Sequence, residues 1–166
     1  MKILNIDMDN VVADFESHYL ALTGATWESE NDALTRWSKL AGKEDLFFLD
    51  MPAFEGAAQF VKTVEQKARE RGYQVQFLTA LPSMWSFPNS MKEKSQWVQE
   101  KLNSTLPVVF GPYAKDKQLH CKLGDILIDD STLNCSQWVR AGGIGIIHRS
   151  FENSLRQLER HLVQPK

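Results

Sequence analysis

Two aspartates lie where the first apolar segment of the chain ends. Residues 2–6 form a short, largely apolar run, and Asp7 and Asp9 follow it at positions i and i+2. Alternate side chains of a strand share a face, so this spacing places both carboxylates on one side. Two such charges about 4 Å apart repel by roughly 4 kcal/mol at an effective dielectric of 20, and a divalent cation removes that repulsion. Mg²⁺ prefers oxygen ligands and often binds one or two carboxylates together with a substrate phosphate. The pair favours phosphoryl transfer on Mg²⁺; the alternative is that both residues cap the next helix.

A second acidic pair has the same design. Asp129 and Asp130 directly follow the apolar run 126–128, which Asp125 precedes. Ser131 after them can start a helix. Ligands of open α/β sheets bind beyond the carboxyl ends of the strands. If the two strands are parallel neighbours, Asp7, Asp9 and Asp129 converge on one point, with Asp130 just behind it. An ordinary turn followed by a helix cap is the alternative for this pair.

The elements that position these acids alternate between strand and helix, which predicts an α/β fold with a parallel sheet and crossover helices. Strands are expected near residues 2–6, 73–78, 107–110, 125–129 and 144–148. Apolar residues at helical spacing predict a helix at about 55–71 and another from residue 151 onward. The long interval between the first two strands predicts a small helical cap over about 17–72, containing Trp27, Trp37, Phe47 and Phe48. Residues 1–16 and 73–166 then form the catalytic core.

Ordered segments along most of the chain resemble the haloacid dehalogenase (HAD) superfamily of phosphatases, and within it the 5'(3')-deoxyribonucleotidases. The first segment, Asp7 to Phe15, is similar to that family's Asp-Met-Asp-Gly-Val-Leu-Ala-Asp-Phe. The other similar segments are Phe47-Phe48 with Pro52 and Gly56-Ala57, Phe77 to Ala80 with Pro82, Lys92 to Val98, Lys115 to Lys117, and Leu127 to Asp130. Two positions depart from the family pattern. Asn10 replaces a glycine, although Asn tolerates a positive φ, and Ala80 replaces a frequent serine.

The resemblance implies a HAD-like Rossmannoid sheet and a role for each acid. Asp7 would attack phosphorus to form an aspartyl phosphate, which divides hydrolysis into two easier displacements. Asp9 would act first as the acid and then as the base. Mg²⁺ would be held by Asp7, the main-chain carbonyl of Asp9, and Asp129. Asp130 would orient metal-bound water.

The resemblance also implies the groups that bind the phosphate. Thr79 and the N–H of Ala80 would hydrogen-bond phosphate oxygens, and Lys94 would supply a charge opposite Asp7. Lys115 and Lys117 would bind the phosphate from outside the core motifs. The alternative for these lysines is a solvated helix surface and a charged loop.

Phe15 and Phe47 would line the nucleoside pocket according to the same resemblance, where an apolar wall disfavours a ribose 2'-hydroxyl left without a partner. Plain core packing is the alternative for each ring. The expected function is therefore a Mg²⁺-dependent phosphatase acting on deoxyribonucleoside monophosphates. A phosphatase for another small ester, such as a sugar phosphate, and a non-catalytic phosphate-binding regulatory module are the other two hypotheses. Binding alone does not need Asp9, which argues against the last.

Composition sets limits on partners and location. The chain has 166 residues, the length of one domain, and a net charge of −2 with a pI near 6.1. Binding of long nucleic acid normally needs a basic face, so a small-molecule nucleotide is the expected partner. No run of 18 apolar residues predicts a membrane span, and the start of the chain resembles no signal peptide, so we expect a cytoplasmic enzyme. Cys121 and Cys135 are expected to be reduced packing residues. Base preference, 5' or 3' specificity and the strength of any deoxy preference are left open, as is a homodimer.

Overall fold

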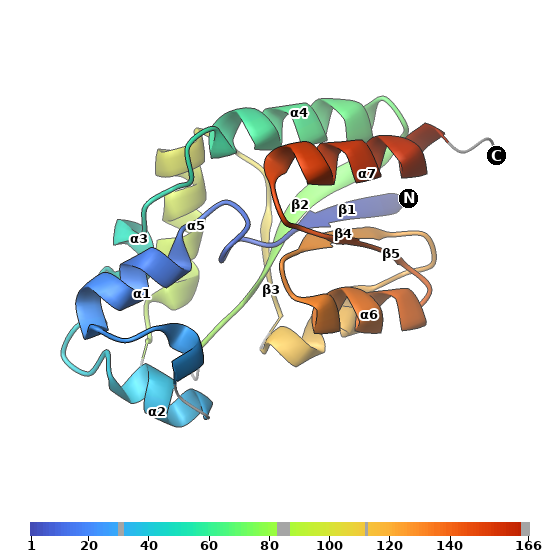
Figure 1. Cartoon of the computed structure of the whole chain (residues 1–166). Helices are drawn as coiled ribbons and strands as arrows, with labels where there is room; N and C mark the ends of the chain where they lie inside the picture. The colour runs from blue at the N-terminus through green and yellow to red at the C-terminus, as the bar shows by residue number, and fades with distance from the viewer. Residues whose placement is uncertain (30–31, 83–86, 112, 164–166) are drawn as a thin grey trace.

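A five-stranded parallel sheet forms the centre of the computed structural model, which describes residues 1–29, 32–82, 87–111 and 113–163 (Figure 1). The strands follow the order β3-β2-β1-β4-β5, and every neighbouring pair is parallel. Their bounds are Lys2–Ile6 for β1, Tyr73–Ala80 for β2, Val108–Gly111 for β3, Ile126–Asp129 for β4 and Ile144–Ile147 for β5. The predicted α/β class and parallel sheet are confirmed. The first and last residues of each predicted strand lie within two residues of those of the observed strand.

The middle strands are apolar because helices cover both of their faces. Leu4 and Ile6 of β1 are fully buried, as are Ile126 and Ile128 of β4. In the register of these strands, Ile6 pairs with Ile128. The residues that follow β1 therefore lie beside the end of β4.

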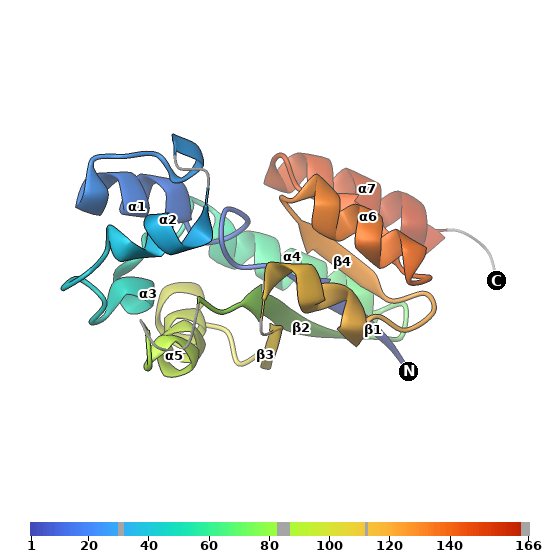
Figure 2. The same ribbon diagram turned by 90° about the horizontal axis from the view of Figure 1, so that it is seen from below.

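Helices α4 and α7 cover one face of the sheet, and α6 with the 3₁₀ helix η2 covers the other (Figures 1 and 2). Their bounds are Ala57–Arg69 for α4, Phe151–Val163 for α7, Thr132–Arg140 for α6 and Ala114–His120 for η2. The positions that the helical spacing predicted to be buried in α4 are all buried: Ala57, Val61, Val64 and Ala68. Among the described residues, no helix combines the length and the apolar character that crossing a membrane requires.

Four short helices lie together beyond the carboxyl edge of the sheet, next to α5 (Ser90–Leu102). They are α1 (Phe15–Thr23), the 3₁₀ helix η1 (Trp27–Ser29), α2 (Ala33–Ser38) and α3 (Phe47–Asp50). The sequence placed the cap over about 17–72, but α4 falls within that range and packs on β2 and α7. We therefore propose a shorter cap segment, residues 15–50. One hydrophobic cluster runs from its aromatic residues into the core of the sheet.

Candidate active site

The loop after β1 folds back on itself and keeps Asp7 and Asp9 at the carboxyl end of the strand. The carbonyl of Met8 accepts hydrogen bonds from the N–H groups of Val12 and Ala13, at 2.9 and 3.0 Å. Asn10 has a φ of 58°, a left-handed conformation that Asn adopts more readily than most residues. The expectation that Asn10 can occupy the turn where the family has glycine is confirmed.

Asp7 and Asp129 lie side by side, as the two acidic pairs predicted. The N–H of Asp7 donates to the carbonyl of Ile128 at 2.9 Å and so extends the pairing of β1 with β4 by one residue. Asp7 is 5% exposed and Asp129 is fully buried. One carboxylate oxygen from each of Asp7, Asp129 and Asp130 lies within 4.8 Å of the others. The three acids therefore form a single cluster.

Lys117, from η2, bridges this cluster. Its Nζ lies 2.7 Å from Oδ1 of Asp7 and 2.7 Å from Oδ2 of Asp129, and the residue is buried. Burial alone would lower the pKa of Lys117, but the charges of the two carboxylates outweigh burial and raise that pKa. The sequence analysis placed Lys117 outside the core motifs and Lys94 opposite Asp7; the structure puts Lys117 beside Asp7 instead. The side chain of Lys115 lies outside the described part of the structure.

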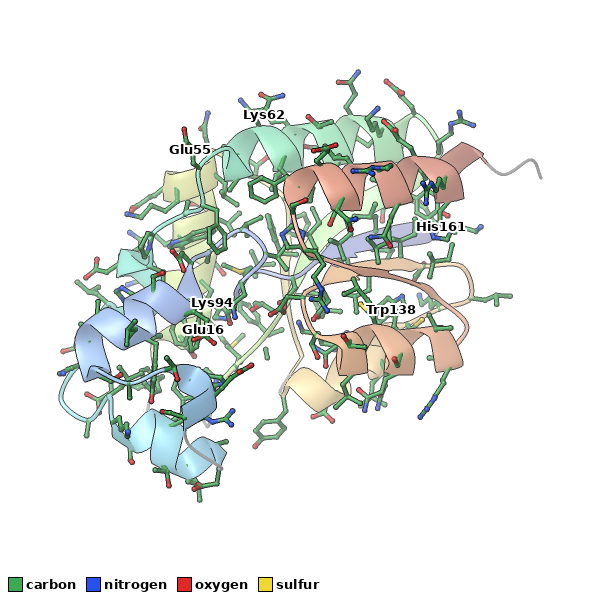
Figure 3. All side chains as sticks on the ribbon, in the orientation of Figure 1. Glu16, Glu55, Lys62, Lys94, Trp138 and His161 are labelled. Atoms are coloured by element: carbon green, nitrogen blue, oxygen red, sulfur yellow. The ribbon has the colours of Figure 1, made fainter. Side chains whose placement is uncertain are left out.

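Lys94, from α5, pairs with Asp9. Its Nζ lies 2.7 Å from Oδ2 of Asp9 and donates a hydrogen bond of 2.8 Å to Oγ1 of Thr79. Lys94 is fully buried in the interior of the molecule (Figure 3). Thr79 is also fully buried, so in this arrangement its hydroxyl positions Lys94. A direct contact between Thr79 and a phosphate, as the sequence suggested, stays a prediction.

One carboxylate oxygen of Asp9 has no partner. Oδ2 is bound by Lys94, whereas Oδ1 is buried and accepts no hydrogen bond from any described residue. Asp9 lines the same cavity as Asp7. A carboxylate in the wall of a cavity is suited to give a proton to a bound molecule or to take one from it.

Asn134 orients Asp129 and was not predicted. Its Nδ2 lies 3.1 Å from both carboxylate oxygens of Asp129, and the N–H of Ser131 donates to Oδ1 at 2.8 Å. Ser131 also caps α6 by accepting the N–H of Asn134 at 3.3 Å. A serine three residues ahead of Asn134 is the usual spacing of such a cap. That signal in the sequence places Asn134 in the first helical turn, close to Asp129.

The cluster has an excess of negative charge. Burial raises the pKa of Asp7 well above its usual value; Lys117 lowers it, and the carboxylates of Asp129, Asp9 and Asp130 raise it further. Burial and the charge of Asp129 raise the pKa of Asp130 to about 6. Clustered carboxylate oxygens with uncompensated charge are a donor set that fits Mg²⁺. The sequence placed Asp130 behind the metal ligands, but its carboxylate belongs to the cluster itself.

A cavity of 550 Å³ opens onto these acids. Part of its lining is polar and comes from residues near the ends of β1 and β4; the part that Phe15, Trp27 and Trp37 of the cap segment form is its aromatic end. The residues that line it are Asp7, Asp9, Asn10, Phe15, Trp27, Ala33, Trp37, Ala80, Leu81, Tyr113, Lys117, Asp130, Ser131 and Asn134.

The aromatic end of the cavity agrees only partly with the residues expected there. Phe15 lines the cavity, but Phe47 lies behind it, with the two ring centroids 5.9 Å apart. The sequence analysis named Trp27 and Trp37 as cap residues without assigning them to the site, and it missed Tyr113. The sequence around an aromatic residue does not indicate whether its side chain lines a cavity or packs in the core.

Comparison with known proteins places the chain in a family. A family model described as 5' nucleotidase, deoxy (pyrimidine), cytosolic type C protein (NT5C) matches residues 1–161. A hydrolase from Streptococcus pneumoniae TIGR4 has a similar fold, with a TM-score of 0.54 and 17% identity over 96% of this chain and 100% of that one. A hydrolase from Pseudomonas syringae has a TM-score of 0.56 and 14% identity over 97% of this chain and 90% of that one. No curated protein matches the chain. The chain belongs to the 5'-nucleotidase family that this model describes, so the expected phosphatase class and the resemblance to deoxyribonucleotidases are confirmed.

Proposed function

We propose that this phosphatase uses Mg²⁺ to hydrolyse deoxyribonucleoside monophosphates through a phosphoaspartate on Asp7. One observation carries the proposal: Asp7 lies at the polar end of a 550 Å³ cavity whose other end is aromatic. A phosphate at Asp7 therefore has room for a nucleoside beside it. The family match supports a nucleotide as substrate.

Asp7 is the nucleophile in this proposal. Its Oδ1 accepts the N–H of Met8 at 2.8 Å and pairs with Lys117, so Oδ2 is the oxygen that we expect to attack phosphorus. The new bond joins Oδ2 to phosphorus, and the bond from phosphorus to the nucleoside oxygen breaks. Lys117 is a fixed cation beside the reacting group, where pre-positioned charge stabilises the transition state most effectively.

Asp9 moves the protons. In its protonated form it gives its proton to the departing nucleoside oxygen in the first step. As a carboxylate it then takes a proton from the water that attacks phosphorus, which releases inorganic phosphate and restores Asp7. The ion pair between Lys94 and Oδ2 of Asp9 fixes the carboxylate in the wall of the cavity, where both transfers take place.

Asp7, Asp129 and the main-chain carbonyl of Asp9 would hold the Mg²⁺, with Asp130 binding it directly or through a water. When bound, the ion would neutralise phosphoryl oxygens and the excess charge of the cluster. Asn134 and Ser131 hold the carboxylate of Asp129 in one orientation. Outer partners of this kind typically tune metal affinity.

The aromatic end of the cavity supports a preference for deoxyribonucleosides. Phe15, Trp27 and Trp37 offer apolar surface to a base or sugar, and Phe47 supports Phe15 from behind. A ribose 2'-hydroxyl buried against such surface without a partner costs about 1–3 kcal/mol. We therefore expect deoxyribonucleotides to react faster than ribonucleotides, and sugar phosphates to react more slowly than either.

A substrate panel tests the proposal. The enzyme is assayed for phosphate release from dUMP, dTMP, dGMP, UMP, glucose 6-phosphate and an aryl phosphate, with Mg²⁺ and with a chelator. The Asp7→Asn variant, purified in parallel, controls for contaminating phosphatase. We expect Mg²⁺-dependent turnover that is fastest on a deoxyribonucleotide. Equal rates on dUMP and UMP would remove the deoxy preference, and faster turnover of the sugar phosphate would favour the other small-ester hypothesis.

A further inference from the structure

Helix α5 buries a carboxylate that the proposed reaction does not use. Glu93 is 4% exposed and directly precedes Lys94 in the chain. Its Oε2 accepts the N–H of Phe48 at 3.0 Å, and its Oε1 accepts the N–H of Leu46 at 3.3 Å. A buried charge is strongly unfavourable unless hydrogen bonds compensate it. The main-chain N–H groups of the cap segment therefore stabilise the buried carboxylate of Glu93, and that carboxylate in turn stabilises the main chain there.

The main chain that Glu93 binds has an unfavourable conformation. Leu46 has a φ of 63°, in the left-handed region that residues with a branched side chain rarely adopt. Such a conformation persists where surrounding contacts impose it. The two hydrogen bonds to Glu93 come from the residues on either side of Phe47. Glu93 is therefore one of the contacts that hold the turn from which α3 starts, and with it the position of Phe47.

Helix α5 also holds Asp9, the proposed proton-transfer group, through Lys94. Lys94 binds Asp9, and its Nζ lies 4.7 Å from the ring centroid of Phe48. Trp97, one helical turn from Glu93, donates from Nε1 to the carbonyl of Met51 at 2.8 Å. Helix α5 therefore carries, on one rigid element, the partner of Asp9 and the bonds that hold residues 46–51.

From α3 the contacts lead to the cavity. The Phe47 ring packs edge to face on Phe15. The ring centroid of Trp37 lies 6.3 Å from the ring centroids of Phe47 and Phe48. Phe15 and Trp37 line the cavity. We infer that Glu93 is a positioning residue for nucleotide binding, which fixes the aromatic end of the cavity relative to Asp9 by holding α3 on α5. The inference rests on the proposed function, which assigns that aromatic end to the nucleoside.

Glu93→Gln is the test, because it keeps the side-chain size but removes the charge and one acceptor oxygen. Kinetics are measured with the best deoxyribonucleotide and with p-nitrophenyl phosphate, a small ester that does not need the nucleoside end. We expect KM for the nucleotide to rise about tenfold with kcat within about threefold, whereas both constants for the aryl ester change by less than about twofold. Glu100→Gln is the matched control, since Glu100 is exposed on the same helix and bonds to Gln96. This control should behave as the wild type.

A second substitution separates positioning from general stability. Leu46→Gly accommodates a φ of 63° without strain, so adding it to Glu93→Gln should recover part of the lost nucleotide affinity, while the missing acceptor oxygen of Glu93 keeps the remainder lost. If Glu93→Gln folds too poorly for kinetics, the double variant is compared with Leu46→Gly alone, and its nucleotide KM must be higher.

Two results would overturn the inference, and a third would refute the proposed function on which it rests. An unchanged nucleotide KM in Glu93→Gln would overturn it. Equal losses on the nucleotide and the aryl ester would also overturn it, because they indicate a smaller folded fraction and no effect on positioning. A wild-type enzyme with no preference for nucleotides over the aryl ester would instead refute the proposed function, which separates that failure from failure of the inference.

Discussion

Replacing Lys117 with methionine removes a cation that two buried carboxylates share. The Nζ of Lys117 lies 2.7 Å from an oxygen of Asp7 and from an oxygen of Asp129. Methionine keeps the apolar part of the side chain, so the main change is electrostatic. The variant leaves the clustered carboxylates without the ammonium group from η2, and we expect a large loss of stability when no metal is added.

The size of this loss follows from burial. Removing one partner of a buried ion pair typically costs about 3–5 kcal/mol, and because one ammonium serves two carboxylates here we expect the upper half of that range. For a chain of this length about 1 kcal/mol corresponds to roughly 2–4 °C, so Tm should fall by roughly 10 °C or more.

The loss should also depend on pH. In the wild type the pKa of Asp7 is raised above its usual value, although the charge of Lys117 lowers it. Removing that charge in Lys117→Met should therefore raise the pKa of Asp7 further. A carboxyl group whose pKa is raised by folding stabilises the protein while it is protonated, and this contribution disappears as the pH rises through the folded-state pKa. The difference between variant and wild type should therefore be greater at pH 8 than at pH 5.

Thermal and urea unfolding followed by circular dichroism, in a chelator at both pH values, measures the effect. Lys62→Met on the exposed surface of α4 is the matched control and should change stability by less than about 0.5 kcal/mol. Adding Mg²⁺ should stabilise Lys117→Met more than the wild type, because the ion supplies the missing positive charge. A Lys117→Met variant as stable as Lys62→Met in chelator at pH 8 would refute this account of the cluster.

Four further predictions follow from the site and the cap. Asp7→Asn should abolish phosphate release while its circular dichroism spectrum stays that of the wild type, and retained turnover would exclude Asp7 as the nucleophile. Asp9→Asn should lower kcat by about 100-fold or more yet still bind vanadate in calorimetry; loss of vanadate binding would mean that Asp9 has a different role. Chelation should stop turnover and Mg²⁺ should restore it, so full activity in chelator would contradict the proposed cofactor. Burial lowers the pKa of His18, so the contribution of His18 to stability should shrink as the pH drops through the usual histidine value of 6.5; the stability difference between wild type and His18→Gln in urea unfolding should shift in favour of the variant from pH 7 to pH 5, and a difference that does not change with pH would show that His18 makes no such contribution.

The meeting of the two acidic pairs could be predicted because each pair is a local pattern. A short apolar run that ends in carboxylates marks a strand whose end faces the edge of a parallel sheet, and both β1 and β4 have this form. Topology then requires only that the two strands be neighbours, which the pairing of Ile6 with Ile128 establishes. The left-handed turn at Asn10 was predictable because the resembling family has glycine there and Asn tolerates a positive φ.

The partners of the acids could not be predicted from local patterns. Lys94 and Lys117 lie on different elements, α5 and η2, and only the packing of those elements decides which lysine meets which aspartate. The amphipathic pattern of α4 indicates a buried face but not which layer it packs against, so the pattern alone does not locate the end of the cap. Glu93 resembles any surface glutamate in the sequence, because its partners are main-chain N–H groups far away in the chain.

Direct detection of a phosphorylated Asp7 tests the central claim most closely. The enzyme is mixed with dUMP and Mg²⁺, quenched in acid during turnover and reduced with borohydride, which converts an acyl phosphate on an aspartate into homoserine. Peptide mass spectrometry then locates the modified residue. The account predicts homoserine at position 7 in the wild type and none in Asp7→Asn. Turnover with an unmodified Asp7, or modification at another carboxylate, would contradict it.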